Sequence, residues 1–101
     1  MTLKVPYLLS ELAQQDILSI REYSMEQWGN VQTNTYLTLL QQRLEWLAGN
    51  PALGKKRDEI KAGYFSFLEG RHIIFYRHAN DGIEIISIIH QSEDIDAHFN
   101  S

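Results

Sequence analysis

The sequence contains no cysteine, and none of its apolar runs approaches the roughly 20 residues of a membrane-spanning helix. A chain without cysteine forms no disulfide, has no thiolate nucleophile and offers no cysteine ligand to a metal. The amino-terminal segment has no charged leader followed by a long apolar core, so we expect no signal peptide. No spacing of histidine and acidic residues indicates a metal site, and nothing indicates a cofactor. These absences favour a cytoplasmic protein that does not act at a membrane.

Positive charge is scarce as well. The chain has 9 lysine and arginine residues against 13 acidic ones, which gives a formal net charge of −4. Proteins that bind a phosphate backbone are usually basic, because neutralising phosphates supplies most of their affinity. The exception here is local, since residues 55–78 hold a group of cations with few acids between them: Lys55, Lys56, Arg57, Lys61, Arg71 and Arg77. Clusters of this kind are most often solvated faces.

The residues that are present suit one globular domain over residues 1–101, of which 44% are hydrophobic and 22% charged. Residues 3–9 have the character of a short strand. Ser10 is a suitable N-cap for a helix that runs to about Trp28. A second helix is predicted over 31–48. Because only a glycine and an asparagine separate the two helices, we expect an antiparallel helical hairpin.

The second half of the chain has the pattern of strands joined by short turns. After a polar loop at residues 54–59, the predicted strands cover 61–68, 71–78 and 83–90, and a short helix starts at Ser92 and docks back through Phe99. Isoleucines on both alternating faces of the last strands predict a sheet that is covered on both sides. The order of elements predicts an α+β fold, an antiparallel β-sheet packed against an N-terminal helical hairpin, with a short C-terminal helix.

The second predicted helix is apolar over more than one stripe. Its main stripe consists of Leu37, Leu40, Leu44 and Leu47. A second stripe lies beside it and consists of Tyr36, Leu39, Arg43 and Trp46. Together the stripes are wider than one sheet contact needs, so either the helix packs on both the first helix and the sheet, or the surplus surface docks a partner.

Several residues recur along the chain in a characteristic order and spacing: Asp16, Tyr23, Trp28-Gly29, Tyr36, Leu40, Pro51, Arg57-Asp58-Glu59, Phe75-Tyr76-Arg77, Asp81-Gly82-Ile83-Glu84-Ile85 and Ile89-His90. Together with the order of elements, this series resembles the ParE toxins of bacterial type II toxin–antitoxin modules, which belong to the RelE/ParE superfamily. The resemblance extends from about Ser10 to Phe99. It implies the fold predicted above and a toxin that a ParD-like antitoxin, a ribbon-helix-helix protein, neutralises.

The resemblance also implies a target and its contact surfaces. DNA gyrase is the expected target, inhibited through binding without a catalytic set, and operator DNA is expected to be contacted only through the antitoxin. The target-binding candidates lie on two neighbouring strands and just beyond them: Arg77 on the strand predicted over 71–78, and His90, Gln91, Ser92, Glu93 and Asp94 at and after the end of the last strand. For the antitoxin, the surplus helical stripe offers the candidates Tyr36, Leu39, Arg43 and Trp46.

Two alternatives remain at the level of sequence. A RelE-like ribosome-dependent mRNA endoribonuclease needs a base, cations and a proton donor, for which the candidates are His90, Arg77, Arg57 and Lys61. Alternatively, the chain is a weakly toxic antitoxin-binding relative, because Ser92 stands where the family pattern commonly has arginine. Structural roles are the plainer interpretation of individual residues: His90 paired with Glu93, and Arg77 paired with the C-terminal segment.

Overall fold

The computed structural model describes residues 7–100 of the chain. Its elements follow in the order β1 (Tyr7–Leu9), α1 (Glu11–Gly49), the 3₁₀ turn η1 (Pro51–Leu53), β2 (Lys55–Lys56), β3 (Tyr64–Glu69), β4 (His72–Ala79), β5 (Gly82–His90) and α2 (Ile95–Asn100). The strands form one sheet in the order β1-β5-β4-β3-β2. The β1–β5 pair is parallel and the other pairs are antiparallel. The predicted α+β fold is confirmed, with a parallel strand added at one edge.

Three local predictions are wrong. The predicted loop at residues 54–59 contains β2, which pairs with β3. The strand predicted over 61–68 begins only at Tyr64, because the preceding residues form turns in which the Gly63 amide donates to Asp58 Oδ1 at 3.0 Å. The C-terminal helix begins at Ile95 and not at Ser92, since Asp94 caps it by accepting the Ala97 amide at 3.2 Å. Of the strand predicted over 3–9, residues 3–6 lie outside the described part.

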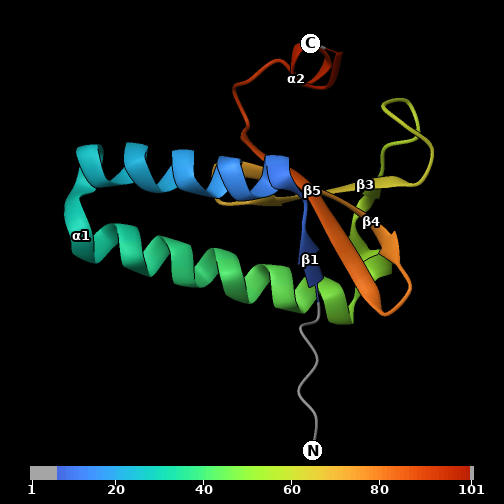
Figure 1. Ribbon diagram of the computed structural model, residues 1–101, viewed down its shortest axis with the longest axis horizontal. Coiled ribbons are helices and arrows are strands. Elements are labelled where there is room, and N and C mark those ends of the chain that lie inside the picture. Colours follow the sequence, from blue (N-terminus) through green and yellow to red (C-terminus); the bar gives the residue numbers. More distant parts are fainter. Residues whose placement is uncertain (1–6, 101) are drawn as a thin grey trace, which may run out of the picture.

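The helical hairpin is confirmed. Ser10 caps α1 by accepting the Ala13 amide at 3.0 Å. The helix reverses direction at Gly29, where φ is +80° and ψ is −176°, a region that is open to glycine and strained for other residues. The first half of α1 (residues 11–28) and its second half (residues 30–49) therefore lie antiparallel, and the turn between them projects beyond the end of the sheet (Figure 1). Among the described residues, no helix combines the length and apolar character needed to cross a bilayer.

Both faces of the sheet are covered, as the isoleucine pattern predicts. On one face α1 and the strands bury a continuous apolar cluster: Ala13, Ile20, Leu40, Leu44, Leu47, Ile74, Tyr76, Ile83, Ile85 and Ile88. On the other face Phe75 is fully buried, and the Phe99 ring of α2 packs edge-on against it with the ring centroids 4.9 Å apart. The predicted docking of Phe99 is thereby confirmed.

Side chains complete the outer edge of β5. The short strand β1 pairs with β5 only at Ile83–Ile85. Beyond that point the Ser10 hydroxyl donates to the Ile86 carbonyl at 2.6 Å, and the Asp16 carboxylate accepts the Ile88 amide at 2.9 Å. An unpaired buried backbone group is costly. The side chains of Ser10 and Asp16, at the start of α1, therefore supply the hydrogen bonds that a longer β1 would have made to β5.

A β-bulge in β5 decides which side chains face α1. From Gly82 to Ile85 the strand pairs with β4 in one register, and from Ser87 onward the register is shifted by one residue, with the irregularity between Phe75 and Tyr76 of β4. A one-residue shift moves every later side chain to the other face. His90 therefore lies opposite His72, on the face that α1 covers.

We predict that Asp16→Ala lowers the free energy of unfolding by about 1–3 kcal/mol, because it leaves the part-buried Ile88 amide and Ser87 hydroxyl without their acceptor. Urea denaturation of the purified protein measures the change. Asp16→Asn keeps one acceptor oxygen and should recover part of the loss. Equal stability of Asp16→Ala and the unmodified chain would contradict this role for the carboxylate.

We also predict that Gly54→Ala is destabilising. The Gly54 amide donates to the Tyr76 hydroxyl at 2.9 Å, and an added Cβ would lie 2.1 Å from that oxygen. Tyr76 is fully buried, so we expect the forced shift to cost about 1–3 kcal/mol. The matched control is Gly49→Ala, because a Cβ at Gly49 meets nothing within 4 Å. A thermal melt in which both variants behave alike would refute the prediction.

Candidate functional site

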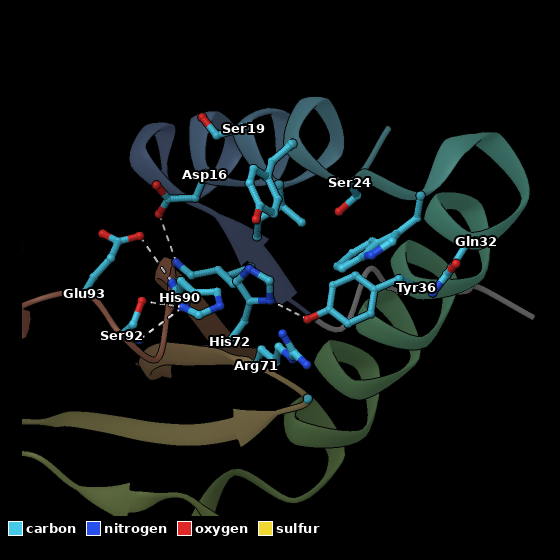
Figure 2. Close-up of a pocket in the computed structure, with 15 residues that line it drawn as sticks. Asp16, Ser19, Ser24, Gln32, Tyr36, Arg71, His72, His90, Ser92 and Glu93 are labelled. Atoms are coloured by element: carbon cyan, nitrogen blue, oxygen red, sulfur yellow. Dashed lines mark hydrogen bonds between the residues drawn. The ribbon is translucent and has the colours of Figure 1, made fainter. Parts of the chain in front are cut away.

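A cleft of about 750 Å³ lies between the two halves of α1 and the nearby end of the sheet. We call it the hairpin cleft. Its walls combine aromatic and ionisable side chains from segments far apart in the sequence: Asp16, Tyr23, Trp28, Tyr36, Arg71, His72, His90, Ser92 and Glu93. Figure 2 shows these side chains converging from the first half of α1, its second half and the β4–β5 end.

Tyr36 and His72 form the floor of the hairpin cleft. The Tyr36 hydroxyl is hydrogen-bonded to His72 Nδ1. Burial, reinforced by the Glu69 carboxylate, raises the pKa of Tyr36 to about 12. Burial also lowers the pKa of His72 below its ordinary value, the neighbouring His90 ring lowers it further, and Glu93 opposes that decrease. At neutral pH, Tyr36 is therefore the donor and a neutral His72 ring is the acceptor.

His90 is held by the turn that follows it. Its Nδ1 accepts the Ser92 amide at 3.1 Å and lies 2.7 Å from the Ser92 hydroxyl. The His90 amide donates to Glu93 Oε1 at 3.3 Å, and the Glu93 amide donates to the His90 carbonyl at 2.9 Å. Since Nδ1 accepts an amide hydrogen, the neutral His90 ring carries its own hydrogen on Nε2. The His72 and His90 rings meet edge to face with centroids 5.5 Å apart. The predicted pairing of the His90 side chain with Glu93 is therefore corrected, because the ring bonds to Ser92 and Glu93 receives only the His90 backbone amide.

The charged side chains that line the hairpin cleft differ in whether the protein supplies them with a polar partner. Asp16 accepts bonds from Ser87 and Ile88. Glu93 accepts the His90 amide, and its second oxygen lies 3.8 Å from His98 Nδ1. Among the side chains that the structure describes, Arg71 has no hydrogen-bonding or ion-pair partner, and it is exposed at the cleft. Among the described residues that line the cleft, the charged side chain without a polar partner is therefore a cation, Arg71.

The structure does not bring together the candidate set for RNA cleavage. Arg77 lies on the sheet face opposite His90 and forms an ion pair with Glu84 of β5 at 2.7 Å. The suggested pairing of Arg77 with the C-terminal segment is therefore corrected. Arg57 binds Glu59 at 2.7 Å and the Ser66 hydroxyl at 3.1 Å, also on the face away from α1. Lys61 lies in the turn that leads to β3, where its backbone amide donates to the Arg57 carbonyl at 3.3 Å.

The surplus helical stripe is mostly packed against the sheet. Arg43 pairs with Glu69 of β3 at 2.6 Å, and its guanidinium lies 4.6 Å from the Trp46 ring centroid. Trp46 in turn packs against Phe67. Leu39 remains 51% exposed and Trp46 37% exposed. Packing on the sheet thus explains most of the stripe, and these two side chains keep apolar surface open.

The segment after β5 is exposed but anchored. Gln91, Ser92, Glu93 and Asp94 are all exposed. The following helix α2 is tied to the sheet by His98, whose Nε2 lies 2.8 Å from the Ser87 hydroxyl. Ser87, His98 and Glu93 follow one another as in a nucleophilic triad, yet Ser87 is fully buried and its hydroxyl also bonds to Asp16. The arrangement is a tether between α1, β5 and α2.

Sequence reasoning missed two residues of the hairpin cleft: Arg71, which it grouped with cations typical of a solvated face, and His72, to which it assigned no functional role. The available signal was the position of His72 at a strand end, next to a tight turn. That signal identifies no partner, because the contact with Tyr36 spans 36 positions and the alignment with His90 depends on the bulge.

Comparisons with known proteins agree on one family. Residues 7–95 match the model of the ParE toxin of type II toxin–antitoxin systems, parDE. The chain is 37% identical over 91 residues to Toxin ParE1 of Mycobacterium tuberculosis, and the aligned region covers 89% of this chain and 93% of that protein. It is 38% identical over 93 residues to Toxin ParE1 of Caulobacter vibrioides, covering 92% and 96% respectively.

A solved structure agrees in fold. It is described as the chromosomal ParDE TA system from P. aeruginosa, and one of its chains superposes with a TM-score of 0.70 over 83% of this chain and 92% of that chain. At 14% identity, this likeness concerns the fold alone.

We predict that the stability of the protein falls as the pH decreases below about 6.5, and that His72 contributes to the fall. The folded-state pKa of His72 is lowered from the ordinary value of 6.5. Between those two pKa values the unfolded chain binds more protons, so acid favours unfolding, and the stabilisation is fully present only above the unfolded pKa. Urea denaturation at successive pH values measures the effect.

The variant His72→Gln should show a shallower decline with pH, because it removes the titrating ring. His78→Gln is the matched control, since His78 is exposed at the other end of the same strand. An identical pH profile for His72→Gln and the unmodified chain would eliminate His72 as a source of the decline.

Proposed function

The chain belongs to the ParE family of toxins from type II toxin–antitoxin systems, and on that premise we propose that it inhibits DNA gyrase by binding and that a ParD-like antitoxin neutralises it. An inhibitor of this kind acts by stabilising one state of its target, for example an intermediate with cleaved DNA, and shifts the equilibrium toward that state. It needs a complementary surface and no set of catalytic groups.

The observation that carries the proposal, beside family membership, is the separation of the candidate groups for RNA cleavage. His90 lies on the face that α1 covers, whereas Arg77 and Arg57 lie on the opposite face and are engaged with carboxylates. General acid–base catalysis requires these groups within hydrogen-bonding reach of one substrate. Their placement supports binding over RelE-like cleavage by this set.

We propose the exposed segment from Gln91 to Asp94 as the contact with gyrase. The turn is ordered by the bonds between His90, Ser92 and Glu93 and by the capping of α2 at Asp94. An ordered segment loses little conformational freedom on binding, which favours affinity. Ser92, which stands where the family pattern commonly has arginine, uses its hydroxyl within this turn, so the proposed contact relies on shape and neutral polar groups more than on a cation.

For the antitoxin, the exposed parts of Leu39 and Trp46 on the second half of α1 supply apolar surface. An amphipathic helix laid along such a surface is a common mode of recognition. The neighbouring Arg43 and Tyr36 are engaged with the sheet, so they hold the surface in place. The antitoxin is expected to be the component that contacts operator DNA, because the toxin carries a net charge of −4.

We predict that the purified protein blocks DNA supercoiling by gyrase, with cleaved DNA accumulating, and that the cognate antitoxin restores the activity. The variant Gln91→Trp adds bulk in the proposed contact and should raise the concentration for half-inhibition about tenfold or more. The control is Gln42→Trp, the same change at an exposed position on the second half of α1. Full gyrase activity at a large excess of folded, growth-inhibiting protein would contradict the proposal and direct attention to RNA cleavage.

A further inference from the structure

A chain of hydrogen bonds ties α2 to the edge of the sheet and fixes where each hydrogen lies. The Ser87 hydroxyl donates to Asp16 Oδ2 at 2.5 Å, and the same oxygen accepts the Ile88 amide at 2.9 Å. A hydroxyl has a single hydrogen, so the Ser87 oxygen accepts from His98 Nε2, which lies 2.8 Å away. His98 Nε2 therefore carries a hydrogen whether the ring is neutral or protonated.

The other nitrogen of the His98 ring faces a carboxylate. Nδ1 lies 3.8 Å from Glu93 Oε2, while Glu93 Oε1 accepts the His90 amide. In the neutral ring Nδ1 is an acceptor, so it opposes a second acceptor and gains no hydrogen bond from Glu93. In the protonated ring Nδ1 is a donor on a positively charged group, and the contact becomes an ion pair. Protonation of His98 thus adds one bond to the chain and breaks none of the others.

The charged groups around the His98 ring do not oppose this ion pair. They are acidic and come from α1, from the segment after β5 and from α2 itself: Asp16, which acts through Ser87, Glu93, Asp94 and Asp96. The cation Arg57, on the same face of the sheet, is engaged with Glu59 and the Ser66 hydroxyl.

The docking of α2 restrains the irregular segment 91–94, which connects β5 to α2 (Figure 1). The helix has 6 residues, and a helix this short does not form alone in water. Its apolar anchor is the Phe99 ring, which packs on Phe75 and lies 6.0 Å from the Tyr64 ring centroid. Its polar anchor is His98. Stronger docking of α2 therefore holds the segment 91–94 more firmly at its second end.

We propose that His98 is a positioning residue for the segment 91–94 and that its protonation tightens the docking of α2. Histidine is the side chain whose charge changes between about pH 5 and pH 8, and carboxylates remain charged over most of that range. Docking therefore strengthens as the pH falls and weakens as it rises. The consequence for gyrase rests on the proposed function: a better ordered contact segment loses less conformational freedom on binding, so inhibition is stronger at mildly acidic pH.

Two other histidines respond to acid in the opposite direction. Protonation of His72 lowers the stability of the whole protein, because burial opposes the charge on its ring and lowers its pKa. Protonation of His90 at Nδ1 removes the acceptor of the Ser92 amide, which loosens the turn. A gain of order in α2 with falling pH is therefore specific to His98.

NMR spectroscopy of the purified toxin tests this role without gyrase. At about pH 8, spectra of the imidazole nitrogens should show His98 with its hydrogen on Nε2. The Ala97 and His98 amides donate to Asp94, so their hydrogen exchange reports the docking of α2. Because the His98 side chain is 17% exposed and that of Glu93 50% exposed, the ion pair is partly screened. We expect exchange, corrected for its intrinsic pH dependence, to slow about two- to fivefold between pH 8 and pH 6.

Two variants separate the charge of His98 from its packing. His98→Gln keeps a donor toward Ser87 and does not titrate, so its exchange should lose the pH dependence. In Glu93→Gln the amide group can donate to a neutral Nδ1 while the oxygen still accepts from His90, so docking should be strongest at high pH. The control is His78→Gln, at an exposed position near the end of β4, which should keep the dependence. A hydrogen on Nδ1 at high pH, or exchange in the unmodified chain that does not slow toward pH 6, would overturn the inference.

Gyrase supercoiling assays at about pH 8 and pH 6.5 then connect this device to the proposed function. The ratio of half-inhibitory concentrations for the unmodified toxin and His98→Gln cancels the effect of pH on gyrase itself. We expect this ratio to fall about twofold or more at the lower pH. If the NMR results are as expected and gyrase is not inhibited at either pH, the proposed function fails and the role of His98 in docking stands. If gyrase is inhibited but α2 shows no pH dependence, only the role of His98 is overturned.

Discussion

The outer edge of β5 is the constraint on which the rest of this structure depends. β5 is the second strand of the sheet and joins the parallel β1 to the antiparallel remainder, but β1 is too short to pair with its full length. The exposed backbone groups that follow are completed by side chains, Ser10 at Ile86 and Asp16 at Ile88. Because both side chains belong to the start of α1, closing the edge also fixes where the helical hairpin begins and how it lies on the sheet.

The same edge connects the fold to the hairpin cleft and to the C-terminal segment. Asp16 accepts a hydrogen bond from Ser87, which in turn contacts His98 of α2, so the start of α1, β5 and the last helix share one polar cluster at the edge of the sheet. At the end of the strand, Glu93 takes the His90 amide and completes the edge. Ser92 and Glu93 belong both to the segment proposed to contact gyrase and to the walls of the hairpin cleft, so these two surfaces are continuous.

The residues that identify the family are largely those that hold this architecture. Asp16 completes the β5 edge, Gly29 allows the reversal of α1, Asp58 closes the turn before β3 and Glu84 pairs with Arg77 across two strands. Such residues explain why family membership and fold can be established together. They do not identify the target, because Gln91, which we propose to contact gyrase, and Leu39, which we propose to contact the antitoxin, lie outside the series.

The sequence by itself determined the α+β class, the helical hairpin with its break at Gly29, the three long strands and the family, because apolar periodicity, caps and turn residues act locally. Tertiary structure alone decided the composition of the site. Regular alternation along β5 would place His90 on the same face as Glu84 and Arg77, which is the arrangement the RNA-cleavage candidates required. The bulge adds one residue to the strand, turns His90 toward α1 and places it opposite His72. A bulge reflects the balance of backbone pairing, side-chain burial and twist across several strands, so no local pattern in the sequence reports it.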